Sequence, residues 1–375
     1  MRHVRLLPRR TLPKAVGFTL VELMVALALG MMIIVTLGFA YLGGARVVNQ
    51  TNALSRMQEG ARFVFESMTR DIRMAGFSGC SQQNSSNVLN ASSSWSVNLF
   101  SQPVNGFEEG GSTFPSGVAG NVLRGDAITI LHADNTQEYI IDSHNPTAAQ
   151  FQLNADHDIK QGEILVACDS NLAVVFQMTN VNNNNTVDVI VHNTGNATAP
   201  GNYTKGFGIP SGATSPFLPW ASCQLDNTKS WCGDVNGTSY TFNAGARIFR
   251  LSGATYYIRT NAAGEPALYR EKLSQSGGNS ATVPEELVPG VENMQILYGE
   301  DTNGDKAVDQ YVTADDVADW SGVRSVRISL LMVTRQDERV VTEAQTYVYN
   351  GATVTASDRL LRRVFTTTIA IRNRL

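Results

Sequence analysis

One short acidic segment has the residue types and spacing of a cation-binding loop. Side chains that carry oxygen recur at positions 1, 3, 5 and 9 of this segment, and position 7 would contribute a backbone carbonyl. The five residues are Asp301, Asn303, Asp305, Ala307 and Asp309. Hard cations prefer a ring of oxygen ligands, so the segment predicts calcium as a cofactor.

The same segment departs from an EF-hand loop at two positions. Lys306 stands where the tight turn takes glycine, and Val312 stands where a glutamate would close the coordination sphere. A ligand from elsewhere, such as Asp315 or Asp316, would have to complete the site. The alternative is a solvated acidic turn between two strands that binds no ion.

The four cysteines are the second group of residues with a chemistry to assign. They are Cys80, Cys168, Cys223 and Cys232, and no C-x-x-C pair among them indicates a metal site. An even number suits disulfides in an oxidising compartment, although four reduced thiols in the cytosol would give the same count. We expect Cys80 to pair with Cys168, tying a helix end to a strand, and Cys223 to pair with Cys232 across a short loop. This is one of three possible pairings.

The sequence contains no recognisable catalytic motif. The five histidines form no H-E-x-x-H motif, and neither G-x-S-x-G nor a Walker A loop is present. We therefore predict that the chain is not an enzyme.

The net charge of the chain is −4, and removing the five basic residues of the first seventeen positions leaves −9 for the rest. A body of that charge gives no electrostatic reason to expect nucleic acid as a partner.

The elements that must position these residues begin with an apolar segment near the N-terminus. From Leu23 to Ala45 the chain has 23 residues without a charge. As a helix they span roughly 34 Å, slightly more than the hydrocarbon core of a bilayer. The basic residues precede this run, so the positive-inside rule keeps the N-terminus cytoplasmic and places everything after Arg46 outside the cytoplasm. No small-x-small cleavage site follows the run, which argues against an ordinary secretory signal.

The helix is predicted to continue beyond the membrane as an amphipathic segment, residues 46–76. Gly43-Gly44 is an expected bend or weak point, and Gly76 ends the pattern. Apolar residues recur at spacings of three and four on the face that we expect to pack on the rest of the protein: Leu54, Met57, Ala61, Val64, Phe65, Met68 and Ile72.

The remainder, residues 77–375, alternates short apolar runs with turn residues. A long helix followed by many strands is an α+β order, so we expect an antiparallel β-rich head packed on the second half of the helix. The Ser- and Asn-rich stretch 81–96 reads as a surface loop. Strands are predicted at 127–131, 138–141, 163–168, 172–178, 187–192, 247–251, 255–259, 267–270, 294–298, 323–333, 345–349 and 365–372.

The residues that open the apolar run resemble a class III (prepilin) signal. They read Gly17-Phe18-Thr19-Leu20-Val21-Glu22-Leu23 and follow a basic leader. The resemblance implies that a prepilin peptidase cuts between Gly17 and Phe18, removes the leader, residues 1–17, and methylates the new terminal amine of Phe18. The transmembrane helix, residues 18–45, then stays in the mature protein.

Glu22 interrupts this apolar stretch. A carboxylate so deep in an apolar helix costs at least ~2.5 kcal/mol unless it is paired or protonated. The resemblance supplies a partner, the charged amine of Phe18 on a neighbouring subunit as it joins a filament. The alternative is a signal-anchor helix whose glutamate lies at the membrane interface.

Further segments resemble the PilW family of minor pilins. They occur in the family's order and cover most of the chain, whereas residues 81–127 and 201–244 match poorly. Trp320 also fits the pattern. The matching segments are 75–80, 256–259, 268–270, 286–294, 298–305, 326–330 and 363–370.

This resemblance implies a type IV pilin-like fold and a low-abundance subunit that helps to initiate pilus assembly at or near the tip. The implied partners are other minor pilins, the major pilin and the prepilin peptidase. The protein would sit in the inner membrane with a periplasmic head and later on the pilus, in a system that serves cell adhesion and twitching motility. Two alternatives remain open. A tip adhesin would bind a surface or ligand through the loops before Ala127 and at 201–243, and a type II secretion pseudopilin would share the prepilin signal and often a calcium loop.

Overall fold

The computed structural model describes most of the chain in two compact units, residues up to Leu54 and residues from Ser55 onward. We treat each unit by itself. Phe18, Cys223 and Cys232 lie outside the described residues. The described residues are 17, 19–80, 84–90, 99–100, 102–111, 114–115, 118–180, 188–194, 198–207, 240–335, 341 and 343–374.

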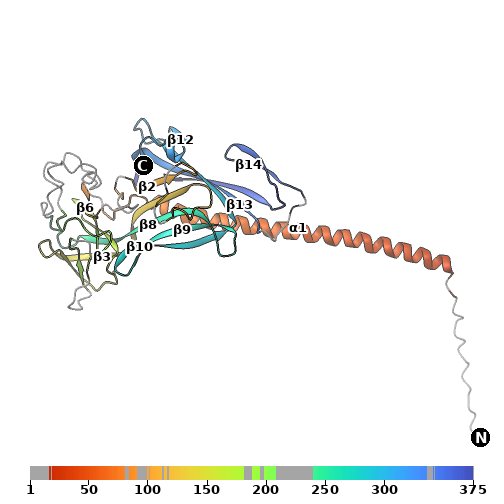
Figure 1. Cartoon of the computed structure of the whole chain (residues 1–375), viewed down its shortest axis with the longest axis horizontal. Helices are drawn as coiled ribbons and strands as arrows, with labels where there is room; N and C mark the ends of the chain where they lie inside the picture. The colour runs from red at the N-terminus through yellow and green to blue at the C-terminus, as the bar shows by residue number, and fades with distance from the viewer. Residues whose placement is uncertain are drawn as a thin grey trace, which may run out of the picture. The chain divides into compact units, whose positions relative to one another are not determined.

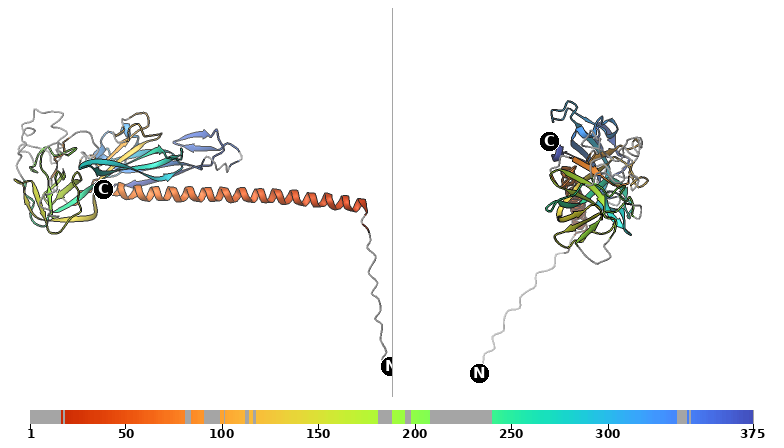
Figure 2. Two further views of the ribbon diagram at one scale, coloured as in Figure 1. Left: turned by 60° about the horizontal axis from the view of Figure 1, so that its bottom comes forward. Right: turned by 90° about the vertical axis from the view of Figure 1, so that its left-hand side faces the viewer.

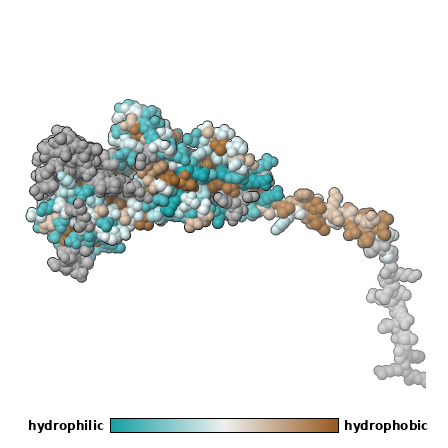
Figure 3. Space-filling model, in the orientation of Figure 1, coloured by the Kyte–Doolittle hydropathy of each residue, from teal (hydrophilic) through white to brown (hydrophobic). Residues whose placement is uncertain are grey.

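One helix, α1 (Leu20–Met74), contains both helical segments expected from the sequence (Figure 1). It continues through Gly43 and Gly44 without interruption. In the first unit its large hydrophobic side chains are exposed from Leu20 to Val48, and they form the brown surface along the helix in Figure 3. By length and composition this helix can cross a membrane, and none of its most apolar 18-residue window is buried.

The part of α1 in the second unit buries one face. Met57, Ala61, Val64, Met68 and Ile72 are each at most 4% exposed, and all five belong to the largest hydrophobic core. Five of the seven residues of the predicted stripe are therefore buried, and Phe65 is partly buried against the same core. Apolar side chains at these spacings lie on one side of a helix, so burying them fixes which face contacts the strands.

Strands make up most of the second unit. They are β1 (Asn84–Asn87), β2 (Val104–Phe107), β3 (Ala127–Asn145), β4 (Gln150–Leu153), β5 (Ile164–Cys168), β6 (Leu172–Gln177), β7 (Val189–Val191), β8 (Arg247–Thr260), β9 (Pro266–Ser276), β10 (Asn279–Pro289), β11 (Val291–Glu300), β12 (Gln310–Val312), β13 (Val323–Val333), β14 (Thr346–Tyr349), β15 (Ala352–Thr355) and β16 (Arg362–Ala370). Three short 3-10 helices accompany them, η2 (Ala314–Asp316), η3 (Trp320–Gly322) and η4 (Arg372–Arg374).

The strands form three sheets. The largest has the order β1-β6-β5-β8-β3-β4-β7, with β9 and β10 added beside β8 and β2 added beside β3. A four-stranded sheet has the order β12-β11-β13-β16, and β14 pairs with β15. Every described pair is antiparallel except β1 with β6. The chain is thus one long apolar N-terminal helix followed by a large β-rich head of mainly antiparallel sheets, as the α+β order predicts.

Two strands run through more than one hydrophobic core. Ile128 of β3 and Tyr256 of β8 pack in the core that also holds α1. Further along the same strands, Ile141 and Ile248 pack in a second core built around Phe151. The left view of Figure 2 shows strands of the second unit running alongside the last turns of α1. Because β3 and β8 pair with each other over most of their length, they connect the two cores.

Some predicted strand boundaries were wrong. The predicted strands 127–131 and 138–141 are one strand, β3, in which a register shift between Asp134 and Tyr139 accommodates the polar residues. The predicted strands 247–251 and 255–259 are likewise one strand, β8. The stretch predicted to be a surface loop contains β1 and, directly after it, the buried Val88 and Leu89.

Candidate functional site

The first turn of α1 is closed by reciprocal hydrogen bonds between Thr19 and Glu22. The Thr19 N–H and hydroxyl donate to Glu22 Oε2 at 2.9 and 3.0 Å, and the Glu22 N–H donates to Thr19 Oγ1 at 3.2 Å. This arrangement is a capping box, which satisfies helix N–H groups that have no partner inside the helix. We did not predict this role from the sequence, although the T-x-x-E spacing before an apolar run is its signature.

The capping box leaves part of Glu22 available. Within the described part of the chain, Glu22 Oε1 accepts no hydrogen bond. Gly17, just before this turn, is exposed, and no atom lies within 4 Å of where a Cβ would be. The cleavage and methylation predicted at Gly17 and Phe18 stay predictions.

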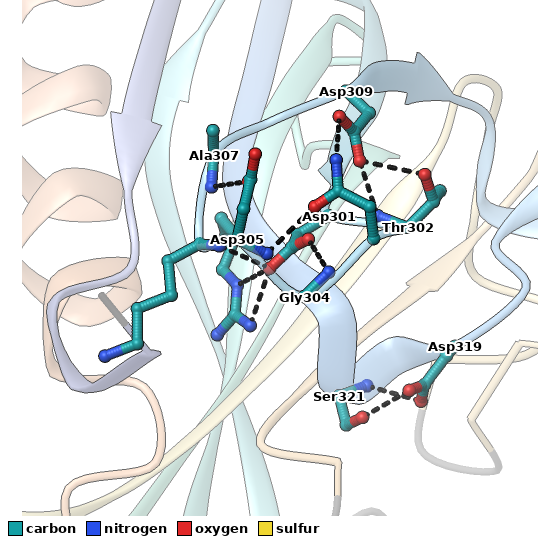
Figure 4. Close-up of polar contacts among 11 residues, drawn as sticks. Asp301, Thr302, Gly304, Asp305, Ala307, Asp309, Asp319 and Ser321 are labelled. Atoms are coloured by element: carbon teal, nitrogen blue, oxygen red, sulfur yellow. Dashed lines mark hydrogen bonds and ion pairs between the residues drawn. The ribbon is translucent and has the colours of Figure 1, made fainter.

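The acidic loop between β11 and β12 is held together by its own hydrogen bonds (Figure 4). Asp309 accepts from the Thr302 N–H and hydroxyl, both at 2.8 Å, and from the Asn303 side-chain amide at 3.0 Å. Asp305 accepts from the Ala307 N–H at 2.8 Å. The carboxylates of Asp305 and Asp309 therefore accept hydrogen bonds from different residues of the loop.

Asp301 carries the strongest contacts of this loop. Its buried carboxylate accepts from the N–H groups of Gly304 at 2.6 Å and Lys306 at 2.9 Å, and it forms an ion pair with Arg324 of β13 at 2.9 Å. Burial raises the pKa of Asp301, but the Gly304 hydrogen bond and the Arg324 guanidinium outweigh it and hold the pKa below its usual value. Lys306 adopts a positive φ of 71°, the conformation that glycine would supply in an EF-hand.

These contacts satisfy the carboxylates of the loop without an ion. The described residues contain no group of three or more His, Cys, Asp or Glu side chains placed to hold a metal ion. Arg324 donates two hydrogen bonds to Asp301 Oδ2 and supplies a compensating charge. Calcium binding by Asp301, Asn303, Asp305, Ala307 and Asp309 therefore stays a prediction, to be tested as follows.

Replacing Arg324 with glutamine should lower the melting temperature of the head by several degrees in chelator, because buried Asp301 loses its counter-charge. If the loop can bind calcium at all, millimolar calcium should recover part of this loss and should affect the wild type less. Thermal unfolding of a chain lacking the residues before Arg46 measures both effects. Arg363→Gln, an exposed change on β16, is the control. An equal melting temperature with and without calcium in both proteins would show that the loop binds no calcium.

A disulfide joins the end of the helical region to the large sheet. Cys80 is bonded to Cys168 of β5, and their Cα atoms are 5.8 Å apart. Gly79, next to Cys80, has a φ of 94°, and a Cβ there would lie 2.3 Å from the Phe249 ring and 3.1 Å from Cys168 Sγ. Only glycine fits at this close approach. The predicted pair of Cys223 and Cys232 lies outside the described residues.

Two histidines meet in the second core. His144 Nε2 and His192 Nε2 are 3.2 Å apart, and the His144 ring stacks on Phe151 with centroids 4.2 Å apart. Burial lowers the pKa of His144 to about 4, and burial together with the neighbouring His144 holds the pKa of His192 well below its usual value. Both rings are therefore neutral at pH 7 and pack among phenylalanines, which is a structural role.

Comparison with known proteins identifies the C-terminal part of the chain. The family model described as Type IV Pilus-assembly protein W matches residues 255–373. This stretch runs from within β8 to η4 and includes every strand of the four-stranded sheet. No curated protein and no solved structure matches the chain. This match, which covers about a third of the chain, supports a PilW-family pilus-assembly protein.

Proposed function

We propose that this protein is a minor pilin that helps to initiate type IV pilus assembly and sits at or near the pilus tip. Prepilin peptidase would cut between Gly17 and Phe18 and methylate the Phe18 amine. The mature subunit would wait in the inner membrane with a periplasmic head, and it would enter the filament with other minor pilins and the major pilin.

The observation that carries this proposal is the uncovered apolar surface of α1 in the first unit. Its hydrophobic side chains are half to three-quarters exposed from Leu20 to Val48, and the 23 residues from Leu23 to Ala45 carry no charge. Leaving so much apolar surface in water would be strongly unfavourable. Lipid tails can cover this surface before assembly, and the helices of other pilins can cover it afterwards.

Glu22 supports the filament part of the proposal. Its Oε2 is used by the capping box, whereas its Oε1 accepts no hydrogen bond from the described residues. A carboxylate oxygen in an apolar environment needs a donor, preferably a charged one. The N-terminal amine of Phe18 on an adjacent subunit would be such a donor.

The match to a pilus-assembly family favours the pilus over a type II secretion system. The matched strands also share a core with the part of α1 that lies in the second unit. The adhesin alternative depends on loops that fall largely outside the described residues, and no described feature favours it.

A deletion strain tests the proposal. Without this protein we expect few or no surface pili, while the major pilin accumulates in the inner membrane. A plasmid copy should restore the pili, and the protein should co-purify with sheared pili at a small fraction of the major pilin. Mass spectrometry of that fraction should show N-methyl-Phe18 at its terminus. Normal numbers of pili in the deletion strain, or a retained leader in pili, would refute it.

A further inference from the structure

A groove of about 680 Å³ lies within the second unit, between the flank of α1 and strand β16. Its apolar lining comes from both elements, with Ala61, Phe65 and Met74 from α1 and Phe365 from β16. Phe65 and Phe365 are only partly buried against the core, so their remaining surface faces the groove. The groove is distinct from the apolar surface of α1 that the proposed function uses.

Beside this groove, β16 is the last strand of the four-stranded sheet. It pairs with β13 along its whole length, and the next backbone bond beyond the strand runs from the Ile371 N–H to the Arg324 carbonyl. In an antiparallel pair, alternate residues bond to the neighbour. The odd-numbered residues of β16 therefore bond to β13, and the even-numbered ones direct their N–H and C=O groups to the open edge.

One even-numbered residue already shows how this edge can be paired. The Arg362 N–H donates to Gln345 Oε1 at 2.7 Å, and Gln345 Nε2 donates to the Arg362 carbonyl at 2.9 Å. A side-chain amide thus forms the two hydrogen bonds that a neighbouring strand would form. For the remaining even-numbered residues, from Val364 to Ala370, the described part of the protein supplies no backbone partner.

The rim of the groove is strongly basic. Arg62, Arg70, Arg73 and Arg372 line it, against a single acid, Glu66. Glu66 pairs with Arg62 at 2.8 Å, and Arg70 lies 3.7 Å from Asp71. Among the described residues no ion pair involves Arg73 or Arg372. The groove therefore carries a net positive charge next to a strand edge with which no described strand pairs.

We propose that this groove binds an extended acidic segment of a partner protein, which adds to the sheet as a strand beside β16. The backbone of the segment would pair with Val364, Thr366, Thr368 and Ala370. Alternate side chains of a strand point to opposite faces, so its apolar residues would contact Phe65 and Phe365. Its carboxylates would reach the arginines of the rim, and charge complementarity selects an acidic segment over a basic one.

The test uses the full chain in detergent and a fluorescent ten-residue peptide in which valine and glutamate alternate. We expect saturable binding, which weakens as salt is raised, and slower hydrogen exchange at the Thr366 and Thr368 amides when the peptide is bound. A peptide with lysine in place of glutamate should not bind. Equal binding of the two peptides would overturn the acidic specificity.

Two matched pairs of variants separate strand addition from a loose charge contact. Thr366→Pro removes an outward N–H that β13 does not use, so the fold should persist while affinity falls at least about tenfold. Thr366→Ala keeps the N–H and should bind like the wild type. Arg372→Glu should weaken binding, whereas Arg359→Glu, outside the groove, should not.

Each contrary result is decisive. If Thr366→Pro binds the peptide as tightly as the wild type, strand addition is wrong. If Arg372→Glu has no effect, the acidic partner is wrong. If the wild type is a dimer in detergent and Thr366→Pro is a monomer, the groove is occupied by a second copy of this chain, and the proposal is overturned. None of these results depends on whether the protein initiates pili.

Discussion

Glu22→Gln is expected to reduce incorporation of the protein into pili on the order of a hundredfold, although membrane insertion and leader cleavage stay normal. Glutamine can still accept hydrogen bonds from Thr19, so the capping box at the start of α1 is preserved. The carboxylate charge is lost, and the amine of the adjacent subunit is left unpaired in an apolar filament core. Breaking a buried charge pair in this way costs about 3–5 kcal/mol, and each 1.4 kcal/mol corresponds to about tenfold in an equilibrium.

The measurement is the amount of mature protein that co-purifies with sheared pili, relative to the amount in the membrane. Glu22→Ala should behave like Glu22→Gln, because both lack the charge, although alanine also removes the cap. Thr19→Ser keeps a hydroxyl for the cap and should be incorporated normally. If Glu22→Gln is incorporated normally and Glu22→Ala is not, then Glu22 acts only as a helix cap and the pairing with Phe18 is wrong.

Replacing both Cys80 and Cys168 with alanine is expected to lower the free energy of unfolding of the head by about 4–5 kcal/mol. The disulfide links residues 88 positions apart, and closing a loop of that length removes this much conformational entropy from the unfolded chain. For a head of this size the melting temperature should fall by roughly 6–7 °C. Alanine is preferred to serine because Cys168 is fully buried, where a hydroxyl would have to find a partner.

Thermal unfolding of the chain without the residues before Arg46 measures this difference. The control is the same pair of proteins in dithiothreitol, which also reduces any bond between Cys223 and Cys232. Under reduction the wild type and the variant should melt at nearly the same temperature. Equal melting temperatures without the reductant would mean that Cys80 and Cys168 are not bonded in the protein.

The elements that the sequence predicted best are those that bury one regular face. The stripe from Met57 to Ile72 has helical spacing throughout, and its members are buried except Phe65, which is partly buried. Strand β13 has the bounds predicted for it, because apolar residues alternate along Val323–Val333 and turn residues precede it. In both cases one local pattern decides the type of element and its orientation.

Two of the strands that the sequence did not predict, β10 and β1, lack that pattern. β10 is mostly exposed, contains Pro284 and pairs only with β9, so it is an edge strand in which proline is tolerated. β1 consists of Asn84, Ser85, Ser86 and Asn87, and it forms only because β6 offers it a free edge. Their structure depends on neighbours that are distant in the sequence.

The contacts of the acidic loop also depend on a residue that is distant in the sequence. The spacing of its oxygen-bearing residues is that of a calcium loop, but spacing carries no information about Arg324, which lies 23 positions after Asp301 and on another strand. By contrast, the helix cap formed by Thr19 and Glu22 could have been predicted from the sequence, because both residues lie in one turn. Contacts between residues of one turn can be predicted from a sequence. A charged side chain that reaches a loop from a strand distant in the sequence cannot.

The bond between Cys80 and Cys168 also gives the protein a mechanical property. Cys80 follows the end of α1 by six residues, and Cys168 lies in β5, which pairs with β6 and β8. A pull on the helix therefore reaches the middle of the large sheet through a covalent link. The 87 residues between the two cysteines lie outside that load path. Fully extended, these residues would add about 300 Å to the length of the chain, and the disulfide prevents that extension.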